Sequence, residues 1–218
     1  MEPIDIHTHR PDAPLSAIRS VTPDTFIPVG ERLYSVGYHP WTLPPFTADA
    51  VEKLEQAARH PQTVAIGESG LDRLHPYPDL QMQWLDRHIR LAEATEKPLI
   101  LHNVRYTAEL IGMHRKYRPA QAWILHGFRG KPDAARQLLD HGFYLSFGER
   151  YNEDALRAVP DERLFIETDE SPVAVEELYR RAATVRGTTA ETLADTIYRN
   201  VRSRFHIVDS TSKCKIRK

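Results

Sequence analysis

Histidines and carboxylates follow short apolar runs at six places in the sequence. They occur in Asp5–His9, Gly37–Pro40, Gly67–Asp72, Leu101–His102, His126–Gly127 and Glu167–Asp169. One residue separates His7 from His9, and side chains alternate along a strand, so both imidazoles are expected on one face. Imidazole and carboxylate form a ligand set suited to Zn, Mn, Fe, Ni or Co. A single His-x-His is a weak signal, because two partly exposed histidines give the same pattern. The metal hypothesis therefore depends on where the other groups lie.

The apolar runs alternate with amphipathic stretches, which is typical of βαβ units and a parallel sheet. The expected strands are Ile4–Ile6, Ala17–Val21, Leu33–Val36, Thr63–Ile66, Pro98–Leu101, Ala122–Leu125, Phe143–Phe147 and Leu164–Ile166. The expected helices are Thr47–Arg59, Asp79–Thr95, Tyr106–Tyr117, Pro132–Asp140, Asn152–Val159, Val173–Arg186 and Thr189–Phe205. The pattern predicts an α/β fold, a (β/α)8 barrel of the TIM type.

The predicted barrel is a small variant. The chain has 218 residues, whereas such barrels usually need about 250. Only a short Pro-containing stretch separates the first two expected strands, so the first crossover is shortened. We expect one domain over residues 1–207, followed by a polar, basic, disordered tail over 208–218.

In a parallel barrel, the carboxyl ends of the strands meet at one face, where active sites lie. The six segments all fall at strand ends of this kind. We therefore expect one or two divalent ions (Zn, Mg, Mn or Ni), bound by His7, His9, Glu68, His102, His126 and Asp169.

Composition narrows the class of function. The net charge is −1, whereas proteins that bind nucleic acid by bulk electrostatics are usually far more basic. If the protein acts on phosphodiesters, the positive charge must be local and come from bound metal and a few arginines. The single cysteine, Cys214, cannot form an intramolecular disulfide framework. The sequence has no leader pattern and no long apolar run. We expect a cytoplasmic protein without membrane contact or an obligate protein partner.

Seven motifs occur in an order that resembles a known family. They are Asp-x-His-x-His (from Asp5), Gly-x-His-Pro (from Gly37), Gly-Glu-x-Gly-Leu-Asp (from Gly67), Leu-His-x-x-Arg (Leu101 to Arg105), His-Gly-Phe-x-Gly (from His126), Gly-Phe-Tyr-Leu-Ser (from Gly142) and Glu-Thr-Asp (from Glu167). The sequence is similar, from about Asp5 to Phe205, to the TatD-related metal-dependent hydrolases. These are also called TatD-type deoxyribonucleases, and they belong to the amidohydrolase superfamily.

The resemblance implies a role for each matching residue. His7 and His9 would bind a first metal together with Asp169, Glu68 would bridge two metals, and His102 and His126 would bind the second. Asp169 would act as general base for a metal-activated water. His39 would lie beside the scissile group, and Arg105 would contact a phosphate.

Several residues allow two interpretations. Asp5 orients a ligand histidine or is simply an acid at the start of a strand. Asp72 has the same two possibilities, and we favour a structural role in the turn that presents Glu68. Arg129 and Lys131 lie before a helix N-terminus, where anions bind favourably, and are phosphate-contact candidates or a solvated surface pair.

Aromatic residues flank the Gly-x-His-Pro motif. Tyr38 and Trp41 lie on either side of His39, where one could stack on a base, although packing is the simpler interpretation.

The sequence departs from the family after Glu-Thr-Asp. The family usually continues with Ser/Ala-Pro-Tyr and a loop with Arg-Gly and Asn-Pro elements, whereas here Glu170-Ser171-Pro172-Val173 leads directly into a helix. The leading hypothesis is a metal-dependent phosphodiesterase or deoxyribonuclease acting on DNA. The alternatives are a metallohydrolase of a small ester, amide or phosphoester, and a non-enzymatic metal-binding protein with a degenerate substrate site.

Overall fold

Eight parallel strands form one sheet whose order in space follows their order in the chain. The computed structural model describes residues 2–207, and the tail expected at 208–218 lies outside the described residues. The strands are β1 (Asp5–Thr8), β2 (Ala17–Val21), β3 (Leu33–Val36), β4 (Thr63–Asp72), β5 (Leu99–Val104), β6 (Trp123–Leu125), β7 (Tyr144–Phe147) and β8 (Leu164–Ile166). A parallel bridge between Thr8 and Asp169 joins the first strand to the segment after the last. The predicted TIM-type barrel is confirmed, and this bridge is the seam at which it closes.

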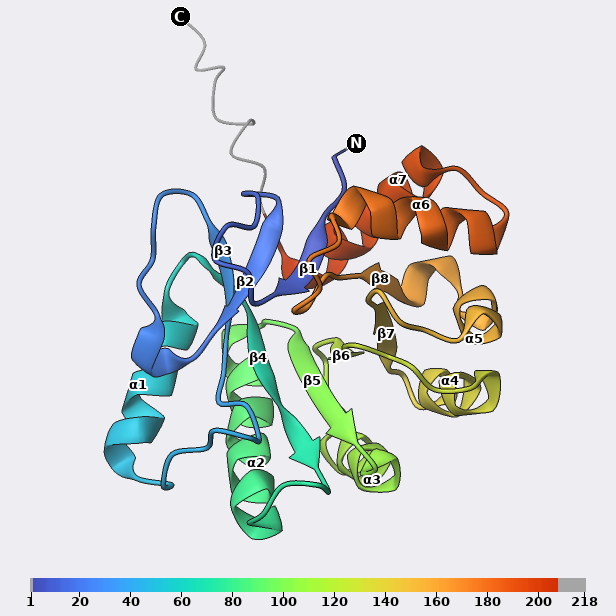
Figure 1. The fold of residues 1–218 in the computed structure, drawn as a ribbon. Helices are drawn as coiled ribbons and strands as arrows, with labels where there is room; N and C mark the ends of the chain where they lie inside the picture. Colours follow the sequence, from blue (N-terminus) through green and yellow to red (C-terminus); the bar gives the residue numbers. More distant parts are fainter. Residues whose placement is uncertain (1, 208–218) are drawn as a thin grey trace, which may run out of the picture.

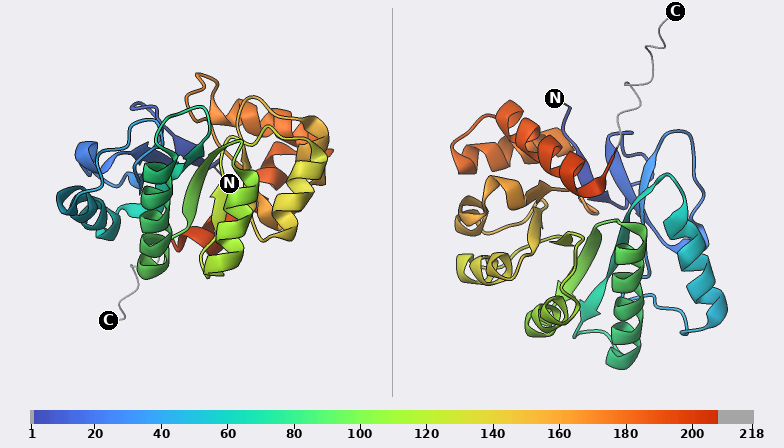
Figure 2. Two further views of the ribbon diagram at one scale, coloured as in Figure 1. Left: turned by 90° about the horizontal axis from the view of Figure 1, so that it is seen from below. Right: turned by 180° about the vertical axis from the view of Figure 1, so that it is seen from behind.

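Seven α-helices lie around the outside of the strands (Figure 1). They are α1 (Ala48–Arg59), α2 (Pro78–Thr95), α3 (Thr107–Tyr117), α4 (Pro132–Asp140), α5 (Glu153–Ala158), α6 (Val175–Arg186) and α7 (Ala190–Phe205). The views from below and behind show the same outer position (Figure 2). Between β1 and β2 the described chain has no helix, and between β2 and β3 it has only the 3-10 turn η1 (Pro23–Thr25). The first two crossovers of the barrel are therefore short, and the sequence predicted this for the first of them.

Side-chain caps define several helix starts. The hydroxyls of Thr47 and Thr189 and the amide of Asn152 accept backbone N–H groups of the first turns of α1, α7 and α5. Pro132 occupies the first turn of α4, where its missing N–H costs nothing.

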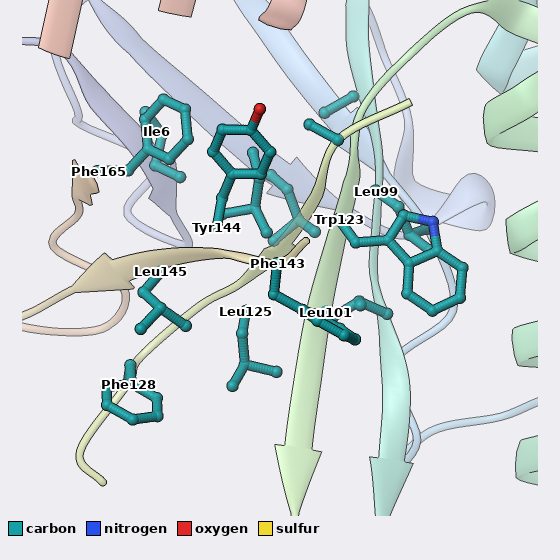
Figure 3. Close-up of a cluster of buried hydrophobic side chains, with 14 of the residues drawn as sticks. Ile6, Leu99, Leu101, Trp123, Leu125, Phe128, Phe143, Tyr144, Leu145 and Phe165 are labelled. Carbon is teal, nitrogen blue, oxygen red and sulfur yellow. The ribbon is translucent and has the colours of Figure 1, made fainter. Parts of the chain in front are cut away.

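The hydrophobic core lies inside the barrel and between the strands and the surrounding helices. Figure 3 shows buried side chains from five strands converging, including Ile6, Leu101, Leu125, Leu145 and Phe165. Burying one such side chain contributes about 1.5–3 kcal/mol, so this layer holds the strand ends in place.

Strand β4 is longer than expected, because it continues to Asp72 instead of ending near Ile66. Between Ile66 and Ser69 it contains one residue more than β5 contains between Leu99 and Leu101, which is a bulge. A Cβ on Gly70 would lie 2.0 Å from the carbonyl oxygen of His102, so only glycine lets the two strands approach this closely. Bulges redirect side chains, and this one places Glu68 among the strand ends.

Within residues 2–207, no helix is long and apolar enough to cross a membrane.

Candidate metal centre

The carboxylate of Glu68 lies at the centre of a histidine cluster. Its Oε2 atom is 3.2 Å from His7 Nε2 and 3.1 Å from His9 Nε2. Its Oε1 atom is close to three further imidazole nitrogens, at 3.0 Å from His39 Nε2, 3.0 Å from His102 Nδ1 and 2.7 Å from His126 Nε2. The structure thus brings together predicted ligands that lie on, or directly after, β1, β4, β5 and β6, and His39, which follows β3.

The ligand atoms fall into overlapping sets, each small enough to surround one ion. One set is His7, His9 and Asp169, a second is His7, Glu68 and His126, and a third is His39, Glu68 and His102, with all atoms of a set within 4.8 Å of one another. The two oxygens of Glu68 point to different imidazoles, which is the arrangement of a carboxylate that bridges two cations. His39, assigned from the sequence to the scissile group, lies where it could equally be a ligand.

The donor chemistry fits divalent cations better than it fits a hydrogen-bond network. The His7 side chain is fully buried, and neither of its ring nitrogens has a hydrogen-bond partner among the described residues. Its Nε2 atom is near Glu68 Oε2, but the alignment is poor for a hydrogen bond. A buried polar atom without a partner costs about 1–3 kcal/mol. A cation between the ring nitrogens and the carboxylates would satisfy these lone pairs.

Charge also favours a cation at this position. Burial opposes ionisation of Glu68, but the charge on His126 and hydrogen bonds from His102, His126 and His39 outweigh it and hold the pKa of Glu68 well below its ordinary value. Burial likewise opposes protonation of His126, yet Glu68 and Glu167 raise its pKa well above the ordinary value. The buried carboxylates thus attract positive charge, which a divalent ion would supply.

Two carboxylates behind the cluster hold the imidazoles in place. Glu167 Oε1 is 3.1 Å from His126 Nδ1 and accepts the Gly127 backbone N–H at 2.7 Å. Asp72 Oδ2 is 3.1 Å from His102 Nε2 and accepts the Trp41 Nε1–H at 2.7 Å. Carboxylates that bind the second nitrogen of a ligand histidine fix its tautomer and raise its basicity.

This geometry changes one assignment made from the sequence and adds one residue that the sequence analysis missed. Asp72 contacts a ring of the cluster as well as the turn, where its Oδ1 accepts the Leu74 N–H at 2.8 Å. Asp72 therefore has the structural role in the turn that the sequence favoured, and it also contacts the imidazole of His102. Glu167 was not singled out as a site residue, although it opens the Glu-Thr-Asp motif directly after the last strand, and that position was the available signal.

Asp5 has a different role from orienting an imidazole. Its Oδ1 accepts the backbone N–H groups of His7 at 3.2 Å and Thr168 at 3.0 Å, and its Oδ2 accepts the Thr168 hydroxyl at 2.6 Å. Burial outweighs these hydrogen bonds and raises the pKa of Asp5 to about 7. Asp5 therefore ties β1 to the segment that carries Asp169, across the barrel seam.

Asp169 is held by its backbone at this seam. Its N–H donates to the His7 carbonyl at 2.9 Å, and its own carbonyl accepts the His9 N–H at 3.0 Å. Its φ of 55° is uncommon for a residue other than glycine and marks a constrained position. The side chain is 29% exposed, with Oδ1 at 3.7 Å from His9 Nε2. Asp169 thus combines contact with the cluster and access to solvent.

The three cations suggested as substrate contacts are all exposed. Among the described residues, the side chains of Arg105, Arg129 and Lys131 have no hydrogen-bond or ion-pair partner. Arg129 lines a cavity of about 230 Å³ next to Asp169, and Arg150, which the sequence analysis missed, lines it too. Lys131 precedes α4 and does not line this cavity. Arg129 is therefore better placed than Lys131 for a substrate bound at the cluster.

The two aromatic residues around His39 differ in environment. Tyr38 is buried, donates its hydroxyl to the Ala50 carbonyl and packs on Trp84, so it is a core residue. Trp41 is 55% exposed beside the cluster.

Comparison with known proteins gives the family. A family model described as "TatD related DNase" matches residues 29–206. The chain belongs to this family. An uncharacterized metal-dependent hydrolase of Escherichia coli strain K12, YcfH, is 30% identical over 207 residues, which are 82% of this chain and 77% of that protein. The predicted family is thereby confirmed.

Other relatives of the TatD-related family match shorter regions. Bacillus subtilis YabD, also named an uncharacterized metal-dependent hydrolase, is 30% identical over 62% of this chain, but the match spans only 57% of YabD. A fission yeast (Schizosaccharomyces pombe) protein named deoxyribonuclease Tat-D is 31% identical over 62% of this chain and 50% of its own length.

Solved structures support the fold of this TatD-related chain. The crystal structure of the TatD homologue YjjV from Escherichia coli K12 has a TM-score of 0.78, at 21% identity over 94% of this chain and 98% of that one. A TatD family hydrolase from Entamoeba histolytica has a TM-score of 0.67, at 15% identity over 79% of this chain and 74% of that one.

Proposed function

We propose that this chain is a divalent-metal-dependent phosphodiesterase that cleaves DNA. The observation that carries the proposal is the position of Glu68, whose two oxygens face separate groups of imidazoles within 3.2 Å. Membership of the TatD-related family and a relative named deoxyribonuclease support the same conclusion.

The residues that would hold two ions are the six expected from the sequence. His7, His9 and Asp169, which form one set of neighbouring ligand atoms, would hold one ion. His102 and His126, which both lie next to Glu68 Oε1, would hold the other, and Glu68 would contact both. His39 would be a further ligand or would contact the scissile group. When bound, such cations strongly lower the pKa of a water molecule and polarise the phosphoryl oxygen.

The protein side chains supply proton transfer and orientation. Asp169 is the cluster carboxylate that reaches solvent, so it would accept the proton from the attacking water. Glu167 and Asp72 would keep His126 and His102 in one tautomer, with the correct nitrogen facing the centre. Arg129 and Arg105 would contact substrate phosphates, because arginine binds phosphate bidentately. Lys131, although exposed, lies outside the cavity and would contribute only at longer range.

One observation favours a smaller substrate. The segment between β8 and α6 is short and leaves no extended loop over Asp169, so little protein covers the substrate side. A small phosphoester, ester or amide would need fewer contacts with the surrounding protein than a nucleic-acid strand would. The third possibility, a metal-binding protein without activity, is one outcome of the test below.

The test combines metal analysis with a substrate panel. Purified protein should retain at least one divalent ion per chain. With Mg²⁺ or Mn²⁺ it should cleave single-stranded DNA, and Glu68→Ala should reduce cleavage by at least ~10²-fold, since losing one electrostatically stabilising group typically costs about 10²–10³-fold. The matched control is Glu177→Gln, an exposed carboxylate on α6, which should leave cleavage unchanged.

Other outcomes would change the conclusion. Cleavage that survives Glu68→Ala would come from a contaminant. Hydrolysis of nitrophenyl esters but not of DNA or phosphodiesters would establish the small-substrate alternative. Metal binding without turnover of any substrate would establish the non-enzymatic one.

A further inference from the structure

Trp41 is the exposed member of the three tryptophans in the chain. Its side chain is 55% exposed, whereas Trp84 and Trp123 are 1% and 0% exposed. An indole contributes more apolar area than almost any other side chain, so leaving it in water forgoes a large burial free energy. The mechanism proposed above makes no use of this ring.

The exposed ring is nevertheless fixed on several sides. Its Nε1–H donates to Asp72 Oδ2 at 2.7 Å, and the Trp41 backbone N–H donates to His39 Nδ1 at 3.1 Å. The His75 ring stacks on it, with centroids 4.9 Å apart and an interplanar angle of 17°. Trp41 and His75 thus form a stacked pair of rings that we call the aromatic shelf. A ring already held in place loses little conformational entropy when a ligand packs on it.

The aromatic shelf adjoins the metal centre. The Trp41 centroid lies 4.9 Å from that of His39 and 5.8 Å from that of His102, with the rings nearly perpendicular in both pairs. A single sugar separates a nucleobase from its phosphate. A base stacked on the shelf would therefore keep its phosphate within reach of the cluster.

The surroundings of the shelf suit a planar, uncharged group. The one polar atom of the Trp41 ring, Nε1, is already bonded to the buried carboxylate of Asp72. The neighbouring cation, Arg73, is already paired with Glu109 at 2.7 Å and lies over the Tyr106 ring. The shelf thus offers stacking, which every nucleobase can use.

We propose that the aromatic shelf binds an unpaired nucleobase of the substrate next to the metal centre. This proposal rests on the proposed phosphodiesterase function. A base inside a duplex already has both faces stacked, so only a frayed end or a single strand presents a free face. Stacking on aromatic side chains contributes enough per base for a preference of ~10-fold or more over a sugar-phosphate without a base.

Binding to two probes tests the shelf separately from catalysis. The probes are dye-labelled oligothymidine phosphorothioates of four nucleotides and abasic phosphorothioates of the same length, measured by anisotropy in Mg²⁺. Wild type should bind the base-containing probe ~10-fold more tightly. Base stacking should also quench tryptophan fluorescence, which reports on Trp41 because the other two tryptophans are buried.

The variants separate stacking from a disturbed metal site. Trp41→Leu and His75→Ala should lose the preference while keeping wild-type affinity for the abasic probe. Trp41→Phe, which keeps a ring but lacks the Nε1–H, should retain part of the preference. The matched control Leu74→Ala, an exposed apolar residue of the same loop, should keep all of it.

Two results would overturn the proposal. The first is equal wild-type affinity for the two probes, and the second is a Trp41→Leu variant that weakens both probes equally. Cleavage of unmodified abasic and base-containing strands at equal kcat/KM would also reject the shelf and leave the phosphodiesterase function intact. Failure to bind or cleave either strand would reject both proposals.

Discussion

At the scale of single residues, the centre depends on carboxylates that fix imidazoles. Glu167 illustrates this, since it receives hydrogen bonds from His126 and the Gly127 N–H while completely buried. A buried carboxylate needs such partners, because an unpaired one costs several kcal/mol. The same contacts that satisfy Glu167 Oε1 leave only the other nitrogen of His126 free to face Glu68.

We therefore expect Glu167→Gln to weaken metal binding. Glutamine can still accept the Gly127 N–H, but it lacks the charge that increases the basicity of His126. Removing such a partner typically costs about 10- to 100-fold in metal affinity. Calorimetric titration of the metal-free protein with Zn²⁺ would measure the change. Glu149→Gln, which alters an exposed carboxylate bonded to Ser171, is the control and should bind normally. Equal affinities for all three proteins would contradict the role assigned to Glu167.

His88 is a buried histidine outside the metal centre. Its Nε2 accepts the Tyr38 N–H at 3.0 Å, and its Nδ1–H donates to the Trp84 carbonyl at 2.6 Å. The bond from Tyr38 needs the neutral ring, because both nitrogens of a protonated imidazole are donors. Burial lowers the pKa of His88 to about 4, which the hydrogen bond to Trp84 only partly opposes.

Stability should consequently depend on pH through His88. The unfolded chain takes up the proton near pH 6.5, before the folded one does, so the contribution of His88 is complete above pH 6.5 and is lost as the pH falls towards 4. The loss amounts to about 3 kcal/mol, at 1.36 kcal/mol per pKa unit. Urea unfolding of the metal-free wild type and His88→Leu should show their difference in unfolding free energy shrinking by about this amount. A difference that stays constant across this range would contradict the assignment.

At the scale of elements, the close contact of β4 with β5 places Glu68. The bulge after Ile66 and the small size of Gly67 and Gly70 bring the two backbones together where both strands carry cluster residues. The pair therefore acts as one support for Glu68, Asp72 and His102.

Replacing Gly70 by alanine should disrupt this support. The new Cβ would lie 2.0 Å from the His102 carbonyl oxygen, and the φ of 153° is one that L residues rarely adopt. Backbone shifts of this kind cost about 1–3 kcal/mol and would move His102 away from Glu68. Thermal unfolding and metal titration should both show the loss.

Gly112 is the matched comparison. It lies in the exposed middle of α3, where a Cβ would meet nothing within 4 Å. Gly112→Ala should raise the unfolding free energy by about 0.5–1 kcal/mol, because alanine favours helix, and should leave metal affinity unchanged. Similar behaviour of the two variants would show that the β4–β5 approach is not what positions the centre.

At the scale of the whole molecule, the barrel closes where the metal ligands lie. The seam between β1 and the segment after β8 has one bridge, from Thr8 to Asp169, and the buried Asp5–Thr168 contacts beneath it. The first metal would join His7 and His9 on one side of the seam to Asp169 on the other. Metal binding and barrel closure should therefore be coupled.

Thr168→Val tests this coupling. Valine removes the hydroxyl that bonds to Asp5 at 2.6 Å and to Thr8 at 2.8 Å, leaving buried groups with fewer partners. We expect a loss of about 1–3 kcal/mol in the unfolding free energy of the metal-free protein, measured in urea. Added metal should stabilise the wild type in proportion to RT ln(1 + [L]/Kd), and the variant less.

A substitution of the same type on the surface is the control. Thr184→Val removes a hydroxyl that bonds only to the Arg180 carbonyl on exposed α6, so it should change neither quantity appreciably. Equal metal stabilisation of wild type and Thr168→Val would show that closure and metal binding are independent.

The sequence alone determined the barrel and the chemical type of its centre. Alternating apolar runs and helical patterns depend on local periodicity, and Ala17–Val21, Leu33–Val36 and Leu164–Ile166 match the observed strands to the residue. Parallel strands share one carboxyl end, so the topology by itself implied that His7, Glu68 and His102 would meet.

Only the tertiary structure decided which groups support the cluster. Period-two alternation does not extend through a bulge or past a strand end, so the contacts of Asp72 and the position of His39 could not be predicted locally. The same limit applies to Tyr38 and Trp41, which flank one histidine but differ in burial. Their environments depend on α2 and the β4–α2 loop, segments distant in sequence that pack there only once the barrel has formed.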